Sequence, residues 1–279
     1  MKDLFNKPDK ITGISEHNID DLTFLICRGG WPHAIGMKEK AALSQAEDYY
    51  DAVVKSDINR ADGVNKNPER VKRLMRSFAR NQGAQIGYTT LRDDIQANDT
   101  GSLNEDTVAS YVNALKKIFV IEDMPAWNPN LRSKTSIRSA DTRYYIDPSI
   151  ATAALGIGPN DLVNDLNTMG LLFETLCVRD LRVYAESIGG DVLHYRDKSG
   201  LECDTVIHLR NGSYGLAEIK LGGQKLIEEG VCNLKALEKK IDTSKMPGPS
   251  FMMIVVGIGD FAYRREDGIY IVPIGCLRH

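Results

Sequence analysis

Apolar residues recur three and four positions apart through the first half of the chain, which is the spacing of amphipathic helices. The pattern predicts helices over residues 21–30, 39–58 and 104–117, and a further helix that starts at Asn67-Pro68. Start and stop signals support this prediction. Asn67-Pro68 provides a cap and a first-turn proline, Asn104 caps the helix over 104–117, and Gly29-Gly30-Trp31-Pro32 ends the first. Residues 1–20 are polar, and we expect them to be loosely ordered.

The middle of the chain continues with a short helix and two apparent strands, at 90–95, 120–127 and 143–146. Helix, short helix, longer helix and basic hairpin is the order of a winged helix-turn-helix module. In such a module 104–117 would be the recognition helix and 128–142 the wing. Glu105 and Asp106 would repel phosphate at the start of that helix, so packing or protein docking is favoured over DNA reading.

The C-terminal third shows alternating strand periodicity as well as helical spacing. In chain order we predict a helix, three strands, a helix and two further strands, at 169–184, 193–196, 202–209, 214–221, 227–241, 251–256 and 268–272. Two short helices, 150–155 and 161–166, connect this part to the preceding one. The whole chain is therefore predicted to combine a helical first part with an α/β second part.

Charged residues interrupt an apolar strand face in this second part. Alternation along strand 214–221 places Glu218 and Lys220 on the face that begins with two apolar residues. In an antiparallel pair, the numbers of two directly opposed residues always add up to the same sum. Asp204, in the neighbouring strand, lies on the face of Glu218 only when this sum is even. A two-residue turn at Asn211-Gly212 would give the odd sum 423 and would place Asp204 and Glu218 on opposite faces of the sheet. We therefore predict a three-residue loop or a bulge between the two strands.

Carboxylates on adjacent strands, close to a helical carboxylate, indicate a divalent metal site. Asp204, Glu218 and the helical Glu174 offer hard oxygen ligands of the kind that Mg²⁺ or Mn²⁺ takes. Lys220 beside such a metal would orient water or lower its pKa. The alternative is a buried salt-bridge cluster without a metal.

Composition describes an ordinary globular protein: 279 residues, 42% hydrophobic and 26% charged, enough for two domains. No apolar run has the length of a membrane helix and no signal peptide is evident, so we expect a cytoplasmic protein. The five cysteines form no CxxC pair, so they do not indicate a zinc site. The net charge of −3 argues weakly against nucleic acid. However, residues 68–147 hold twelve basic and ten acidic residues, with a candidate DNA-contacting patch at Arg132, Lys134, Arg138 and Arg143. A solvated loop is the alternative.

The chain resembles the PD-(D/E)xK nuclease superfamily and, more closely, the uncharacterised C-terminal domain of bacterial AAA-type ATPases. The matching stretches are Gly29–Pro32, Ser56–Ile58, Thr107–Leu115, Gly170–Glu174, His194–Asp197, Gly200–Asp204 and Glu218–Gly222. The resemblance implies a restriction-endonuclease-like domain with a mixed central sheet. It also implies that Asp204, Glu218 and the Ile219 carbonyl hold Mg²⁺, that Glu174 supports the site, and that Lys220 positions water. Arg196 and Glu202 belong to the same pattern, and we expect them to form a structural ion pair.

The family usually carries a P-loop ATPase ahead of this region, but no GxxxxGK[ST] motif occurs here. We therefore expect a truncated chain or a gene that lacks the motor, with residues 1–66 as a helical segment, 67–150 as the winged module and 151–279 as the nuclease-like domain. The predicted function is Mg²⁺-dependent cleavage of DNA phosphodiester bonds. The alternative is a non-catalytic module that binds DNA or docks on a protein, such as an ATPase domain or a partner subunit.

Overall fold

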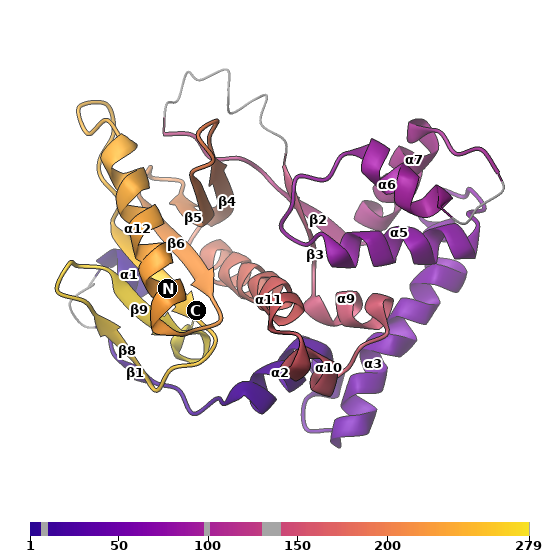
Figure 1. The fold of residues 1–279 in the computed structure, drawn as a ribbon, viewed down its shortest axis with the longest axis horizontal. Helices are drawn as coiled ribbons and strands as arrows, with labels where there is room; N and C mark the ends of the chain where they lie inside the picture. The colour runs from indigo at the N-terminus through magenta and orange to yellow at the C-terminus, as the bar shows by residue number, and fades with distance from the viewer. Residues whose placement is uncertain (7–10, 98–100, 130–140, 279) are drawn as a thin grey trace. The chain divides into compact units, whose positions relative to one another are not determined.

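The computed structural model describes residues 1–6, 11–97, 101–129 and 141–278 (Figure 1). Its contacts form two compact units. Unit 1 consists of Met1–Leu22, Met124–Asp141 and Cys177–His279, and unit 2 consists of Thr23–Asp123 and Thr142–Leu176. The predicted mixed α+β class is confirmed, and the predicted boundaries at 66/67 and 150/151 remain predictions.

Unit 2 is mainly helical. Its helices are most of α2 (Ile19–Arg28), η2 (Pro32–Ala34), α3 (Glu39–Ala52), η3 (Val53–Asp57), α4 (Ile58–Arg60), α5 (Pro68–Arg80), α6 (Tyr88–Gln96), α7 (Glu105–Lys117), α9 (Pro148–Leu155), α10 (Pro159–Asn164) and the first half of α11 (Leu166–Glu186). Strand β2 (Ile121–Met124) pairs with β3 (Thr142–Tyr145) in a two-stranded sheet. The predicted order of helix, short helix, longer helix and two strands is therefore present, while most of the predicted wing at 128–142 lies outside the described residues. No described helix combines the length and the apolar character needed to cross a membrane.

Local signals explain where these helices begin. The Asn67 side chain accepts hydrogen bonds from the backbone N–H groups of Glu69 and Arg70, at 2.9 and 3.3 Å, and Pro68 occupies the first turn. Asn104 caps α7 in the same way, accepting from the Thr107 N–H at 2.8 Å. Both predicted caps are confirmed.

Replacing Asn67 by alanine should lower the free energy of unfolding by about 1 kcal/mol, because two N–H groups of the first turn lose their acceptor. Chemical denaturation of the full chain measures this change. An Asn65→Ala variant, at an exposed position outside the helix, is the control. Equal stability of the Asn67→Ala variant and the control would contradict the capping role.

Unit 1 is built around a seven-stranded mixed sheet in the order β1-β8-β9-β7-β6-β5-β4. Its strands are β1 (Gly13–Ile14), β4 (Gly190–Arg196), β5 (Glu202–Leu209), β6 (Tyr214–Lys220), β7 (Phe251–Val256), β8 (Phe261–Arg264) and β9 (Tyr270–Pro273). Strands β4, β5 and β6 are antiparallel, while β7 runs parallel to both β6 and β9. The chain also contributes α1 (Lys2–Asn6), α12 (Gln224–Lys240) and η4 (Ile274–Cys276).

Helix α12, which follows β6 and precedes β7 along the chain, covers one face of this sheet (Figure 1). Val231, Leu234 and Leu237 of α12 form one core cluster with Tyr214 and Leu216 of β6. The sequence from α11 to β7 therefore reads α-β-β-β-α-β, as the residue pattern predicted. The face of β6 under α12 is the same face that bears the charged candidates.

The N-terminal prediction was wrong for the described residues. Residues 2–6 form a helix, Leu4 is buried, and the Phe5 ring meets the Phe251 ring edge-on at 5.0 Å between centroids. Gly13 and Ile14 pair with Ala262 and Phe261 of β8. Few apolar residues are enough to order this segment because the sheet edge supplies backbone hydrogen-bond partners.

Candidate metal centre

The hairpin between β5 and β6 has the register that a shared site needs. Thr205 pairs with Ala217 and His208 with Tyr214, so paired numbers sum to the even value 422. The Leu209 N–H donates to the Ser213 carbonyl at 2.8 Å, which leaves a three-residue loop at 210–212. Gly212 has φ 87°, the left-handed conformation typical of the last residue in such loops. The prediction of a three-residue loop or a bulge is confirmed, and the structure has the loop.

This register places Asp204 opposite Glu218, one step beyond the last ladder pair. The Lys220 ammonium lies between the two carboxylates, with Nζ 3.2 Å from Asp204 Oδ2 and 2.7 Å from Glu218 Oε2. Because hydrogen-bonded and non-hydrogen-bonded pairs alternate, and Leu209–Ser213 is a bonded pair, Asp204 and Glu218 occupy a non-bonded position. Opposing side chains approach most closely at such positions.

The backbone ladder changes where the site begins. The Ile219 N–H donates to Asp204 Oδ2 at 2.7 Å, so a side-chain carboxylate takes the place of a backbone acceptor on β5. Asp204 is thereby fixed by the backbone of β6 as well as by Lys220. The predicted contribution of the Ile219 carbonyl to a metal site remains a prediction.

Helix α12 closes over these groups at a glycine. A Cβ on Gly230 would lie 3.3 Å from Glu218 Cβ and 3.5 Å from Lys220 Cε, so the absent side chain permits close packing. Glu218 is 1% exposed, and its Oε1 atom has no hydrogen-bond partner among the described residues. A buried carboxylate oxygen without a partner is costly, and a bound cation is one arrangement that would satisfy it.

Burial and charge shift the acid–base behaviour of the cluster. Burial, aided by the negative charge of Asp204, raises the pKa of Glu218 to about 8, while Lys220 and Asn233 act in the opposite direction. Burial disfavours the charged form of Lys220, but Asp204 and Glu218 outweigh it and hold the pKa of this ammonium above its usual value. Lys220 is therefore a cation at neutral pH, and it serves as a hydrogen-bond donor rather than as a base.

Glu174 belongs to unit 2, whereas the other three candidates belong to unit 1. Its Oε1 atom accepts a hydrogen bond from the Tyr144 hydroxyl at 2.7 Å, within unit 2. Its support of a metal site therefore remains a prediction. Arg196 and Glu202 form the expected ion pair across β4 and β5, at 3.2 Å.

Two families of unknown function account for most of the sequence. Residues 19–161, just over half of the chain, match a family described as a domain of unknown function, DUF8612. The chain belongs to this family. Residues 169–277 match a second domain of unknown function, DUF4143. No curated protein and no solved structure matches the chain.

The Asp204–Glu218–Lys220 cluster thus lies in the DUF4143 segment, and the basic candidates lie in the DUF8612 segment. Arg132, Lys134 and Arg138 fall outside the described residues. The Arg143 side chain is 14% exposed; it pairs with Asp123 at 3.1 Å and donates to the Ile86 carbonyl at 2.8 Å. Arg143 therefore links β3 to β2 and to the segment between α5 and α6.

The donor set fits Mg²⁺, although only in part. Among the described residues, no group of three or more His, Cys, Asp and Glu side chains is placed to hold a metal ion. Mg²⁺ is commonly held by one or two carboxylates, with water and substrate oxygens completing its shell. Asp204 and Glu218 supply such a pair, and the unpartnered Glu218 Oε1 is an available donor atom.

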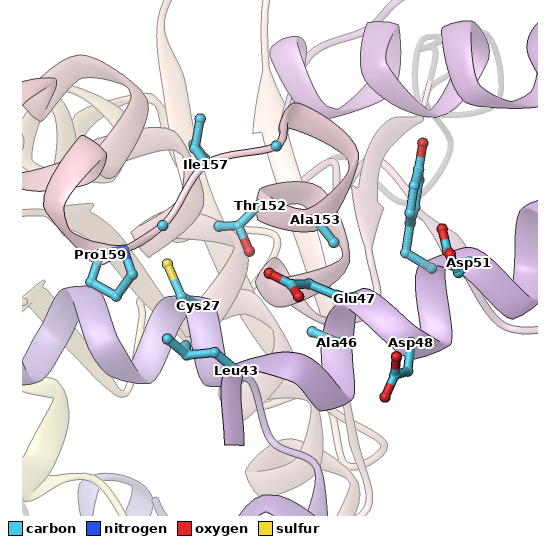
Figure 2. A pocket seen from close by; sticks show the side chains of 13 residues that line it. Cys27, Leu43, Ala46, Glu47, Asp48, Asp51, Thr152, Ala153, Ile157 and Pro159 are labelled. Carbon is cyan, nitrogen blue, oxygen red and sulfur yellow. The ribbon is translucent and has the colours of Figure 1, made fainter. Parts of the chain in front are cut away.

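The DUF8612 segment contains a cavity of about 510 Å³ among α2, α3, α9 and the start of α10. Figure 2 shows Glu47, Asp48 and Asp51 of α3 at this cavity, together with Cys27 and Thr152. Burial raises the pKa of the Cys27 thiol to about 12, so it is not a thiolate nucleophile at neutral pH. The cavity contains none of the candidates predicted from the sequence.

Proposed function

We propose that unit 1 is a Mg²⁺-dependent phosphodiesterase that cleaves DNA. The observation that carries this proposal is the approach of Asp204 and Glu218, with a buried, unpartnered Glu218 oxygen and Lys220 between the two carboxylates. A bound cation would satisfy the Glu218 Oε1 atom, which the Lys220 ammonium leaves without a partner.

Each residue has a distinct role in this proposal. Asp204 and Glu218 would hold the cation, and the Ile219 N–H would keep Asp204 in place. Bound Mg²⁺ would neutralise the phosphodiester and lower the pKa of a coordinated water. Lys220, as an ammonium, would donate hydrogen bonds to the attacking water or to a phosphate oxygen, and would thereby fix the direction of attack.

The α-β-β-β-α-β order and the spacing of Asp204 and Glu218-x-Lys220 support membership in the PD-(D/E)xK superfamily. They also support the resemblance to the C-terminal domain of AAA-type ATPases. Under this proposal an ATPase domain or subunit is the expected partner. This chain would supply the cleavage chemistry but not the ATP hydrolysis.

One observation favours a second candidate, a non-catalytic interaction module. Lys220 already contacts both carboxylates, so its ammonium takes the position of positive charge that a metal would otherwise supply. In such a protein the nuclease-like fold would persist while the cluster served only stability, and divalent cations would bind no more tightly than to the rest of the surface.

An Asp204→Asn variant tests the proposal. We expect Mg²⁺- or Mn²⁺-dependent nicking of supercoiled plasmid by the wild type, and a loss of about 100-fold in the variant because one metal ligand is gone. Asp191→Asn, an exposed change on the neighbouring β4, should retain full activity.

Cation binding to the purified chain, measured by calorimetry, separates the two candidates. Binding that Asp204→Asn abolishes supports the metal site. Cleavage that is equal in Asp204→Asn and Asp191→Asn would identify a contaminating nuclease and overturn the proposal. Absence of both cleavage and cation binding would favour the non-catalytic module.

A further inference from the structure

Helix α5 concentrates positive charge in a chain whose net charge is −3. Its thirteen residues include one acid, Glu69, and five basic residues: Arg70, Lys72, Arg73, Arg76 and Arg80. The apolar residues of α5 are buried in unit 2, so this helix is anchored by one face and presents the other to solvent.

Three of these cations form a single row. Lys72, Arg76 and Arg80 are each four residues apart, all are exposed, and successive members are separated by about 6 Å along the helix axis. None of the described residues forms an ion pair with Arg76 or Arg80, while Lys72 contacts Glu69 at 3.0 Å on the surface. Arg73 lies outside the row and donates to the Ile95 carbonyl at 3.1 Å.

We propose that the exposed row Lys72, Arg76 and Arg80 on helix α5 binds the phosphate backbone of duplex DNA. Guanidinium groups suit this partner because they present paired donors to phosphate oxygens and stay charged at every physiological pH. Regular spacing along a rigid helix holds the charges apart at fixed intervals, which suits a polyanion with repeating phosphates.

The surroundings of the row argue against two other negatively charged partners, an acidic protein and an anionic membrane. Protein interfaces have an apolar centre, but no large apolar side chain among the described residues of α5 is exposed. A helix that lies on an anionic membrane inserts apolar side chains beside its cations, whereas the apolar face of α5 is packed inside unit 2. Purely ionic contact with a phosphate backbone requires neither feature.

The row also accounts for DNA contact better than α7, the helix that the winged-helix order would place in the groove. Glu105, at the start of α7, contacts Arg92 at 3.5 Å and accepts from the Thr89 hydroxyl at 2.9 Å. Its carboxylate is thus committed to α6, and it adds negative charge where a phosphate would approach. The described surface of this module attracts DNA along α5.

Binding of the full chain to a short labelled duplex, measured by fluorescence anisotropy with EDTA present, tests this inference. No cation or cleavage is needed, so its failure is distinguishable from failure of the proposed nuclease activity. Each phosphate contact contributes about 0.9 to the slope of log affinity against log salt. Raising the salt from 50 to 200 mM weakens DNA binding by both proteins. For an Arg76→Gln/Arg80→Gln variant, the factor by which affinity falls should be about 12 times smaller than for the wild type, because two phosphate contacts are gone.

Two further variants control this experiment. Lys38→Gln/Lys40→Gln makes the same change of charge at exposed positions around the start of α3 and should keep the wild-type slope. Arg76→Lys/Arg80→Lys retains the charge and should also keep it. Absence of binding by the wild type, or equal slopes for the row variant and the α3 control, would overturn the inference. Binding of a polyglutamate peptide as tight as that of DNA would overturn it in favour of an acidic protein partner.

Discussion

Replacing Glu218 by glutamine should stabilise the metal-free protein at alkaline pH by an amount on the order of 3 kcal/mol. Burial and the charge of Asp204 raise the folded-state pKa of Glu218 to about 8, from the ordinary value of 4.5. Between these two values the folded state binds more protons than the unfolded state. The stabilising contribution of this group is therefore complete below pH 4.5 and is lost as the pH rises through 8. Glutamine has the same shape and no charge to bury.

Urea denaturation in EDTA at pH 5 and pH 9 measures the effect, with Trp127 as the tryptophan of unit 1. The stability difference between Glu218→Gln and the wild type should grow with pH, because only groups distant from Glu218 titrate alike in the two proteins. Glu202→Gln, at a half-exposed carboxylate on the same hairpin, should show little pH dependence. A constant difference would mean that Lys220 keeps Glu218 ionised throughout, and it would favour a permanent ion pair.

Replacing Gly29 by alanine should destabilise unit 2 by about 3 kcal/mol or more. Gly29 has φ 74°, and an added Cβ would overlap Asp147 Oδ1 and the Ser149 hydroxyl. These atoms form the junction to which the Gly29–Pro32 turn is bound. Asp147 accepts from the Gly30 N–H at 2.8 Å, and Ser149 accepts from the Trp31 indole at 2.9 Å. Moving Asp147 aside would break the cap of α9 as well as the turn.

Gly63→Ala is the matched control for this experiment. Gly63 has a similar φ of 71°, but nothing lies within 4 Å of the position its Cβ would take. The control therefore isolates the cost of the left-handed backbone, about 1 kcal/mol. Denaturation midpoints of the two variants should differ clearly, and equal losses would show that the junction with Asp147 is not the cause.

The sequence predicted the parts of the fold that depend on local chemistry. Asn67 and Asn104 identified two helix starts, and the parity argument identified the three-residue loop that brings Asp204 to the face of Glu218. These predictions succeeded because caps and register are decided by residues close together in the chain. In the sequence, the opposite charges of Glu218 and Lys220 look balanced. They therefore do not indicate the unpartnered Glu218 oxygen, which results from packing under α12.

Other features depend on distant contacts or on periodicity within a segment. Strand β1 exists because β8 offers it an edge, and neither short strand stands out by composition. The total charge of residues 68–147 hides the row on α5, because the acids of α6 and α7 offset the five cations of this helix. The spacing of Lys72, Arg76 and Arg80 at four-residue intervals was a readable signal. Arg143 was predicted to face DNA, but only the structure shows that Asp123 engages it.

The interleaving of the two units along the chain limits how the protein can be divided. The backbone passes between the units at 22/23, 123/124, 141/142 and 176/177, so no single cut releases either one intact. A fragment that starts at residue 169 would lack α1 and β1, leaving the outer edge of β8 unpaired and the Phe251 ring without Phe5. Exposed strand edges recruit other chains. Aggregation of such a truncated fragment would therefore reflect the missing N-terminal strand, and it would carry no information about the metal centre.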